Sequence, residues 1–180
     1  MQTIRANIQG VVLTYTKHIG IDPGKSGAAA CVTISDGSID DVDWLCFNHR
    51  DTSAKQILKT FQTNWTNPKS CVVEKVHSSP QMGVVSSFSF GKSAGTIEVL
   101  VDLAYPLTWT YCSPRYWQSR LNCLTKGNKN VTRLAVKKML PRIAKQITHR
   151  NADAILIALY GAVQHECIDL ELITEKQELF

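Results

Sequence analysis

The chain has 180 residues, of which 44% are hydrophobic and 19% charged, and its formal net charge is +5. This length supports one domain with a well-buried core and is too short for two domains of ordinary size. No segment approaches the roughly 20 consecutive apolar residues of a membrane-spanning helix, and the first residues lack the basic-then-apolar order of a signal peptide. We therefore expect a cytoplasmic protein without a membrane partner.

Basic residues are concentrated in one stretch of the chain. No Asp or Glu occurs between Asp102 and Asp153, whereas ten Lys and Arg residues do. These cations are Arg115, Arg120, Lys126, Lys129, Arg133, Lys137, Lys138, Arg142, Lys145 and Arg150. Most charged residues after Asp153 are acidic, namely Glu166, Asp169, Glu171, Glu175 and Glu178. A surface of this kind suits the phosphates of nucleic acid, and the alternative is an ordinary solvated basic face.

The six cysteines are scattered along the chain and several lie in apolar runs. We expect reduced thiols in the core rather than disulfides or a zinc site. Neither Cys46 with His49 nor His165 with Cys167 has a second pair of ligands at zinc-finger spacing.

Strands dominate the first quarter of the sequence. Residues 1–16 show no clear period and leave two alternatives, an additional strand or an extension without regular structure. Beyond them, Pro23-Gly24 and Asp36-Gly37 are turn signals that divide runs of apolar and β-branched residues. Antiparallel strands are therefore predicted over 18–22, 27–35 and 39–47.

Helices and strands alternate in the remainder. Ser53 is a candidate N-cap for a helix whose apolar positions, up to Trp65, follow helical spacing. Asn151 is a candidate N-cap for a strongly apolar last helix. Strands are predicted over 71–76 and 107–112, with helices within 84–104, over 114–121, up to Leu140 and over 152–163. This order predicts an α/β fold, a mixed sheet with helices on its faces.

Two carboxylates interrupt strands that are otherwise apolar. Asp22 ends the first predicted strand, and Glu74 lies in the run from Cys71 to Val76. If these strands are parallel neighbours, the carboxylates meet at the carboxyl ends of the strands, where open α/β sheets place their sites. Adjacent carboxylates in a low-dielectric pocket repel each other unless a cation lies between them, and Mg²⁺ prefers oxygen ligands.

Two further residues extend this candidate site. Asp153 falls at the start of the last helix, where the helix dipole favours an anion, although simple capping would explain it as well. His149 precedes it by four residues and shares its face if helical turns extend that far, so it is a candidate ligand or proton shuttle.

Four segments, three of which contain these residues, resemble in order the motifs of the RuvC family of Holliday junction resolvases, in the ribonuclease H-like superfamily. They are Gly20-Ile21-Asp22-Pro23-Gly24, Val73-Glu74-Lys75-Val76, Phe90-Gly91-Lys92-Ser93-Ala94-Gly95 and His149-Arg150-Asn151-Ala152-Asp153-Ala154. The resemblance spans about residues 17–163. Ser113-Pro114-Arg115 with Trp117 and Leu121, followed by a lysine-bearing loop and a helix ending near Leu140-Pro141, is more similar to the bacteriophage branch.

The resemblance implies a ribonuclease H-like fold with a five-stranded mixed sheet flanked by helices, and a homodimer. It implies two Mg²⁺ ions per active site, replaceable by Mn²⁺, and no nucleotide cofactor. The implied ligands and catalytic residues are Asp22, Glu74, His149 and Asp153. Many bacterial members carry the fourth ligand three residues before the last acid, where this chain has Arg150, so the His149 spacing matches the phage pattern and Asn151 is the second candidate.

The implied activity is paired nicking of four-way DNA junctions, which leaves a 5′ phosphate and a 3′ hydroxyl. Implied DNA contacts are Lys25, Lys75, His77, Lys92, Arg115, Lys126, Lys129, Arg133 and Lys137. Phe88 and Phe90 suit core or dimer contacts better than base stacking. We expect an extension over 1–16, a nuclease domain over 17–165 and an acidic tail over 166–180.

Three alternatives compete with this hypothesis. A related nuclease could act on other branched DNA, flaps or RNA–DNA hybrids, and the sequence does not separate these substrates. A non-catalytic junction-binding protein would not need all three acids. An actin-like phosphotransferase would need a longer chain and a second phosphate-binding glycine turn.

Overall fold

The computed structural model describes residues 4–8, 11–24, 26–47, 52–78 and 80–169. In chain order its elements are β1 (Ile4–Ile8), β2 (Val11–Asp22), β3 (Ala28–Ser35), β4 (Ser38–Cys46), α1 (Ala54–Thr63), β5 (Ser70–Glu74), α2 (Val84–Ala104), β6 (Trp109–Cys112), α3 (Pro114–Arg120), α4 (Asn130–Met139), the 3₁₀ helix η1 (Pro141–Gln146) and α5 (Ala152–Gln164). None of the helices in this part of the chain is long and apolar enough to cross a membrane.

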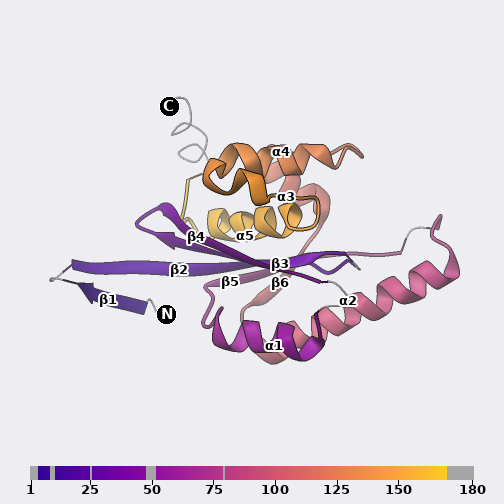
Figure 1. Cartoon of the computed structure of the whole chain (residues 1–180), viewed down its shortest axis with the longest axis horizontal. Coiled ribbons are helices and arrows are strands. Elements are labelled where there is room, and N and C mark those ends of the chain that lie inside the picture. The colour runs from indigo at the N-terminus through magenta and orange to yellow at the C-terminus, as the bar shows by residue number, and fades with distance from the viewer. Residues whose placement is uncertain (1–3, 9–10, 25, 48–51, 79, 170–180) are drawn as a thin grey trace.

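The sheet is mixed, as the sequence predicts. Five strands follow the order β4-β3-β2-β5-β6. β3 pairs antiparallel with β2 and β4, whereas β5 pairs parallel with β2 and β6. β1 pairs antiparallel with the first part of β2, which extends beyond the other strands (Figure 1). The strand alternative for residues 1–16 is therefore correct for Ile4–Ile8, and β2 begins at Val11 rather than at residue 18.

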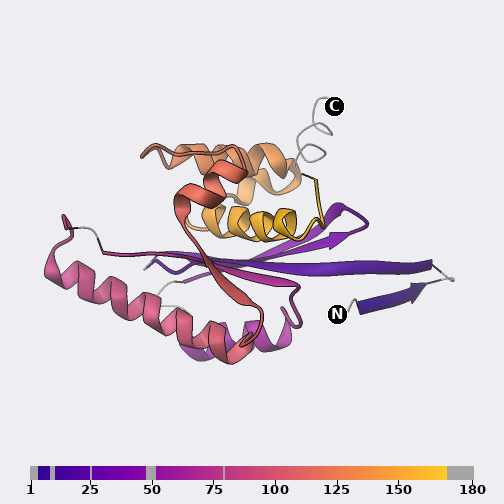
Figure 2. The ribbon, with the colours of Figure 1, turned by 180° about the vertical axis from the view of Figure 1, so that it is seen from behind.

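Helices cover both faces of the sheet. Figures 1 and 2 show α1 and α2 on one face and α3, α4 and α5 on the other. The residues of α5 from Ala154 to Val163 are all buried, because the helix lies between the sheet and α4. A helix that is apolar all round is expected at such a central position.

Sequence signals for the helix ends were partly correct. Ser53 caps α1 through a capping box, in which its hydroxyl accepts from the Gln56 amide and the Gln56 side chain accepts from the Ser53 amide. However, α1 ends at Thr63, and Trp65 is buried beyond the helix. Asn67 adopts a positive φ of 51° just before Pro68, a conformation that interrupts helical structure.

The cysteines are free thiols, as expected. Four of them are buried, and burial raises the pKa of Cys31 to about 12. His49, the residue paired with Cys46 in the zinc hypothesis, lies outside the described residues.

His18 is a fully buried polar residue on β2. Its Nδ1 lies 2.8 Å from the Ser70 hydroxyl and its Nε2 lies 3.0 Å from the Thr16 hydroxyl. Burial, reinforced by the charges of His165 and Lys69, lowers the pKa of His18 to about 3. The ring is therefore a neutral, hydrogen-bonded part of the core at physiological pH.

Candidate metal centre

Asp22 and Glu74 end two adjacent parallel strands. Ile21 of β2 is in register with Val73 of β5, so the next residue of each strand is the carboxylate. The two strands are therefore the parallel neighbours that a meeting of Asp22 and Glu74 requires. Both side chains are partly buried at the carboxyl ends of their strands.

The turn after Asp22 keeps its side chain at the end of the strand. The Gly24 amide donates to Asp22 Oδ1 at 3.1 Å. A Cβ atom at Gly27 would lie 2.1 Å from the Asp22 carbonyl oxygen, so the chain folds back tightly against the strand. Lys25, one of the predicted DNA contacts, lies outside the described residues.

Glu74 accepts a hydrogen bond from a residue of the helices that cover the sheet. The indole Nε1 of Trp117, on α3, donates to Glu74 Oε1 at 2.9 Å. Trp117 itself is completely buried. The sequence did not reveal this bond, because the residues around Trp117 in the chain do not indicate what its indole N–H contacts.

Asp153 lies in the first turn of α5, as expected. Its Oδ1 is buried and has no hydrogen-bond partner among the described residues. An orphaned carboxylate oxygen is costly in the protein interior, which suggests a missing positively charged group.

The residues just before α5 differ from the prediction. His149 and Arg150 are exposed and belong to a turn, since α5 begins at Ala152. Asn151 is buried, but it does not cap α5 through its side chain. Its Oδ1 accepts from the Thr148 amide at 2.8 Å and its Nδ2 donates to the Gln146 carbonyl at 3.1 Å, so its amide closes the preceding turn instead.

One cleft of about 490 Å³ contains all four predicted catalytic residues. Its lining residues are Asp22, Gly24, Ser26, Gly27, Glu74, Val76, Phe90, Pro114, Gln118, Thr125, Lys129, Thr132, His149, Arg150 and Asp153. The strand ends, the α2 and α3 helices, the loop before α4 and the start of α5 thus meet at one place.

Burial and mutual repulsion govern the electrostatics of this cleft. Burial, followed by the charge of Asp22, raises the pKa of Glu74 to about 7, against the Trp117 hydrogen bond that lowers it. The pKa of Asp22 is raised mainly by burial, and the charge of Asp153 adds to the increase. Burial also raises the pKa of Asp153, although a hydrogen bond from Thr132 and the charges of Lys129 and His149 act in the opposite direction.

The donor set has the chemistry of a hard divalent cation site. Burial disfavours the ionised form of all three carboxylates, and a bound Mg²⁺ would stabilise that form. Asp153 Oδ1, which has no hydrogen-bond partner among the described residues, is a suitable ligand. As they stand, no three His, Cys, Asp or Glu side chains of the described residues lie close enough together to hold one ion. The residues fit the ion in their chemistry, whereas a complete coordination shell is not formed.

The predicted DNA-contacting residues are spread over several surfaces. Lys129 lines the cleft, and its charge lowers the pKa values of all three acids. Lys75, His77, Arg115 and Lys126 are exposed near cleft-lining residues. Arg133 and Lys137, on α4, are partly buried. Lys92 lines a separate cavity of about 260 Å³ between α1 and α2.

Several cleft residues were absent from the predicted site. Gln118, Thr125, Thr132 and Arg150 line it together with the acids. Gln118 Oε1 accepts from the Thr125 amide at 3.2 Å, which fixes the loop leading to Lys129. Neutral side chains such as Gln118, Thr125 and Thr132 carry no pattern that distinguishes them. Arg150 was predicted only as one cation of the basic stretch and as the occupant of a ligand position, not as a residue of the site.

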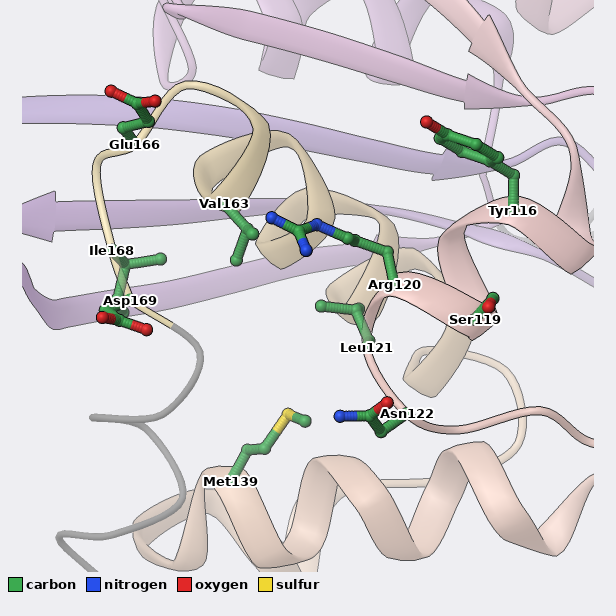
Figure 3. Close-up of a pocket in the computed structure, with 10 residues that line it drawn as sticks. All are labelled: Tyr116, Ser119, Arg120, Leu121, Asn122, Met139, Val163, Glu166, Ile168 and Asp169. Carbon is green, nitrogen blue, oxygen red and sulfur yellow. The ribbon is translucent and has the colours of Figure 1, made fainter.

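A larger cavity of about 850 Å³ lies between α3, the end of α4 and the end of α5 (Figure 3). It is lined by Tyr116, Ser119, Arg120, Leu121, Asn122, Met139, Val163, Glu166, Ile168 and Asp169. Asp22, Glu74 and Asp153 are all absent from its lining. The chemistry of the carboxylate cleft, rather than cavity size, identifies the candidate site.

Comparison with known proteins supports the fold. A structure of T. thermophilus RuvC in complex with Holliday junction substrate is 18% identical to the chain, with a TM-score of 0.53, and the match covers 84% of this chain and 95% of that one. A second Thermus thermophilus RuvC structure is 16% identical, with a TM-score of 0.54 and coverage of 86% and 98%. No protein-family model and no curated protein matches the sequence. The chain therefore has the expected ribonuclease H-like fold, a mixed sheet flanked by helices.

Proposed function

We propose that this protein is a Mg²⁺-dependent endodeoxyribonuclease that resolves four-way DNA junctions by paired nicks. The observation that carries the proposal is the convergence of Asp22, Glu74 and Asp153 in one cleft, with an unpartnered Asp153 oxygen. The fold, similar to that of a structure described as bound to a Holliday junction substrate, supports the choice of DNA substrate.

The chain's own residues account for the main tasks at this centre. Asp22, Glu74 and Asp153 would hold two metal ions, with His149 as the fourth ligand from the exposed rim of the cleft. Bound Mg²⁺ supplies activation of water and stabilisation of negative charge on the phosphate, and Mn²⁺ supplies the same chemistry. The expected products carry a 5′ phosphate and a 3′ hydroxyl.

Cations around the cleft orient the DNA. Lys129 and Arg150 line it, so their charges attract the phosphate that the acids would otherwise repel. Exposed Arg115 and Lys126 adjoin the cleft-lining Pro114 and Thr125, which extends the positive surface outward. Contacts of this kind set affinity and position on the duplex without reading sequence.

The partner that completes a two-nick reaction is a second copy of the chain. A two-fold dimer presents two identical centres to the two strands of a four-way junction. The exposed apolar residues of α2 support this proposal, since Val84, Val85 and Phe88 are 86%, 83% and 75% exposed on a helix that extends past the sheet (Figure 1). An apolar patch of this kind is typical of an interface.

The proposal also includes the domain bounds, the branch of the family, the compartment and the pathway that the sequence indicated. The nuclease domain would span residues 17–165, within a bacteriophage-like branch of the resolvases. The protein would act in the cytoplasm, that of the host cell if the gene is of phage origin, in DNA recombination or repair.

A substrate panel tests the proposed function. Purified protein with Mg²⁺ would be incubated with a four-way junction, a flap, linear duplex and an RNA–DNA hybrid of matched sequence, each labelled at one 5′ end. We expect cleavage of the junction at symmetric positions, with products that DNA ligase can join. Equal rates on linear duplex would overturn the junction specificity, and preference for the flap or hybrid would favour the alternative nuclease.

A further inference from the structure

The contact between Trp117 and Glu74 joins the protein core to the candidate metal centre. Trp117 belongs to a core cluster with Leu121, Cys123 and Val136, and its side chain has no exposed surface. Its indole Nε1 donates to Glu74 Oε1 at 2.9 Å, across 43 positions of the sequence. A ring enclosed in this way has one available orientation, so its N–H direction is fixed by core packing.

Glu74 needs such a partner in the absence of a cation. Its carboxylate shares the cleft with Asp22 and Asp153, whose charges oppose its ionisation. A free side chain would rotate to separate the charges. The indole N–H holds Oε1, and the other oxygen, Oε2, is the one that this bond leaves available.

The donor is also neutral, and this matters for a metal centre. A Lys or Arg at this position would satisfy Glu74 equally well, but its charge would compete with a cation for the carboxylate. An indole orients the oxygen and leaves the negative charge in place. Second-layer donors of this kind tune metal sites in general.

We propose that Trp117 is a positioning residue for the metal centre, which orients Glu74 through the Nε1–Oε1 bond before the ion binds. This inference rests on the proposed function, because Glu74 must be a metal ligand. The adjacent Gln118 supports the same role for α3, since its Oε1 accepts from the amide of Thr125, which also lines the cleft.

Replacement of the indole by a ring without a donor tests the proposal. Trp117→Phe should bind Mn²⁺ on the order of 10-fold more weakly than the wild type in isothermal titration calorimetry, as expected for removal of an outer-layer partner. Trp65→Phe is the matched control. Trp65 is buried, and its Nε1 donates to Asp43 Oδ2 at the same 2.9 Å, away from the cleft. Equal affinity in Trp117→Phe and the wild type, or an equal loss in Trp65→Phe, would overturn the proposal.

A double-variant cycle separates positioning from general damage to the fold. In a Glu74→Gln background, Trp117→Phe should cause no further loss of Mn²⁺ affinity, because the indole acts through that carboxylate. A second 10-fold loss in this background would contradict the proposal. If wild-type protein binds no Mn²⁺ at all, the proposed function fails and this inference fails with it.

A measurement on wild-type protein covers the case in which Trp117→Phe does not fold. Indole N–H resonances of the four tryptophans are assigned by elimination with Trp44→Phe, Trp65→Phe and Trp109→Phe. Substoichiometric Mn²⁺ should broaden the Trp117 resonance first and leave that of Trp65 sharp. Bound Mn²⁺ that broadens Trp65 as strongly as Trp117 would place the ion elsewhere and overturn the proposal.

Discussion

A Cβ atom at Gly20 would lie 2.1 Å from the backbone nitrogen of Ala158. β2 and α5 thus pack backbone against backbone, two residues before Asp22 and within two turns of Asp153. This close approach brings the start of α5 to the end of β2, where the carboxylates share the cleft. Glycine at this position is therefore a requirement of the site as well as of the core.

Gly20→Ala should destabilise the protein strongly. The added methyl group would meet backbone atoms of Ala158 and Ala154, which cannot move aside as a flexible side chain can. We expect the free energy of unfolding in urea to fall by about 3 kcal/mol or more. Gly95→Ala, in a helix where a Cβ meets nothing within 4 Å, is the control and should increase stability slightly. Similar stabilities for Gly20→Ala and wild type would show that the packing is looser than described.

Glu74→Gln should stabilise the metal-free protein at pH 8 but not at pH 4.5. The pKa of Glu74 is raised from 4.5 to about 7 on folding, so its stabilising contribution is present below pH 4.5 and is lost as the pH rises through 7. An amide avoids this loss. The stability difference between variant and wild type should grow by on the order of 1–3 kcal/mol between the two pH values.

Urea denaturation in EDTA at both pH values measures this difference. His18 loses stabilisation as the pH falls from 6.5 toward 3, but it does so equally in both proteins and cancels. A difference that stays constant with pH would mean that Glu74 titrates normally. Added Mg²⁺ should raise the stability of the wild type more than that of Glu74→Gln.

DNA affinity should depend on salt through the cations beside the cleft. Arg115→Ala and Lys126→Ala should each reduce the slope of log K against log salt by about 1, because each removes one cation that pairs with a DNA phosphate. Lys55→Ala is the control and should leave the slope unchanged, because Lys55 is an exposed residue of α1, on the opposite face of the sheet from α3 (Figure 1). Fluorescence anisotropy with a labelled junction measures the slope, and equal slopes for all four proteins would remove these residues from the DNA surface.

The sequence predicted those parts of the fold that depend on local patterns. Apolar runs and turn residues placed β3, β4 and β5, whereas the parallel pairing that brings Asp22 beside Glu74 was only a condition of the predicted site. The first strand was predicted to begin only at residue 18, because residues 1–16 show no clear period in the sequence. In the structure Val11–Thr14 pairs with β1 alone, and pairing with β3 begins at Tyr15. Packing against α5, which leaves no space beside Gly20, cannot be read from a single glycine.

In the candidate site, the charged residues could be predicted from the sequence because they interrupt apolar runs, whereas the neutral residues could not. Asp22 and Glu74 stand out in their strands, and Asp153 stands out in an apolar helix. Trp117 and Thr132 contribute through hydrogen bonds that depend on how α3 and α4 pack, so their roles required the structure. Asn151 resembles an N-cap in sequence, but its side chain bonds backward to the Thr148 amide and the Gln146 carbonyl, which the sequence pattern does not indicate.

The most direct test of the proposed metal-dependent nuclease is single-turnover cleavage of a labelled four-way junction by wild-type protein and by Asp22→Asn. The wild type should cleave with Mg²⁺ and not with EDTA. The cleavage rate of Asp22→Asn should be lower than that of the wild type by about 10³-fold or more, as expected when a group essential to the reaction is removed. Its junction affinity should stay within a few-fold of the wild-type value. An Asp22→Asn protein that cleaves the junction at the wild-type rate would contradict the assignment of this cleft as the active site.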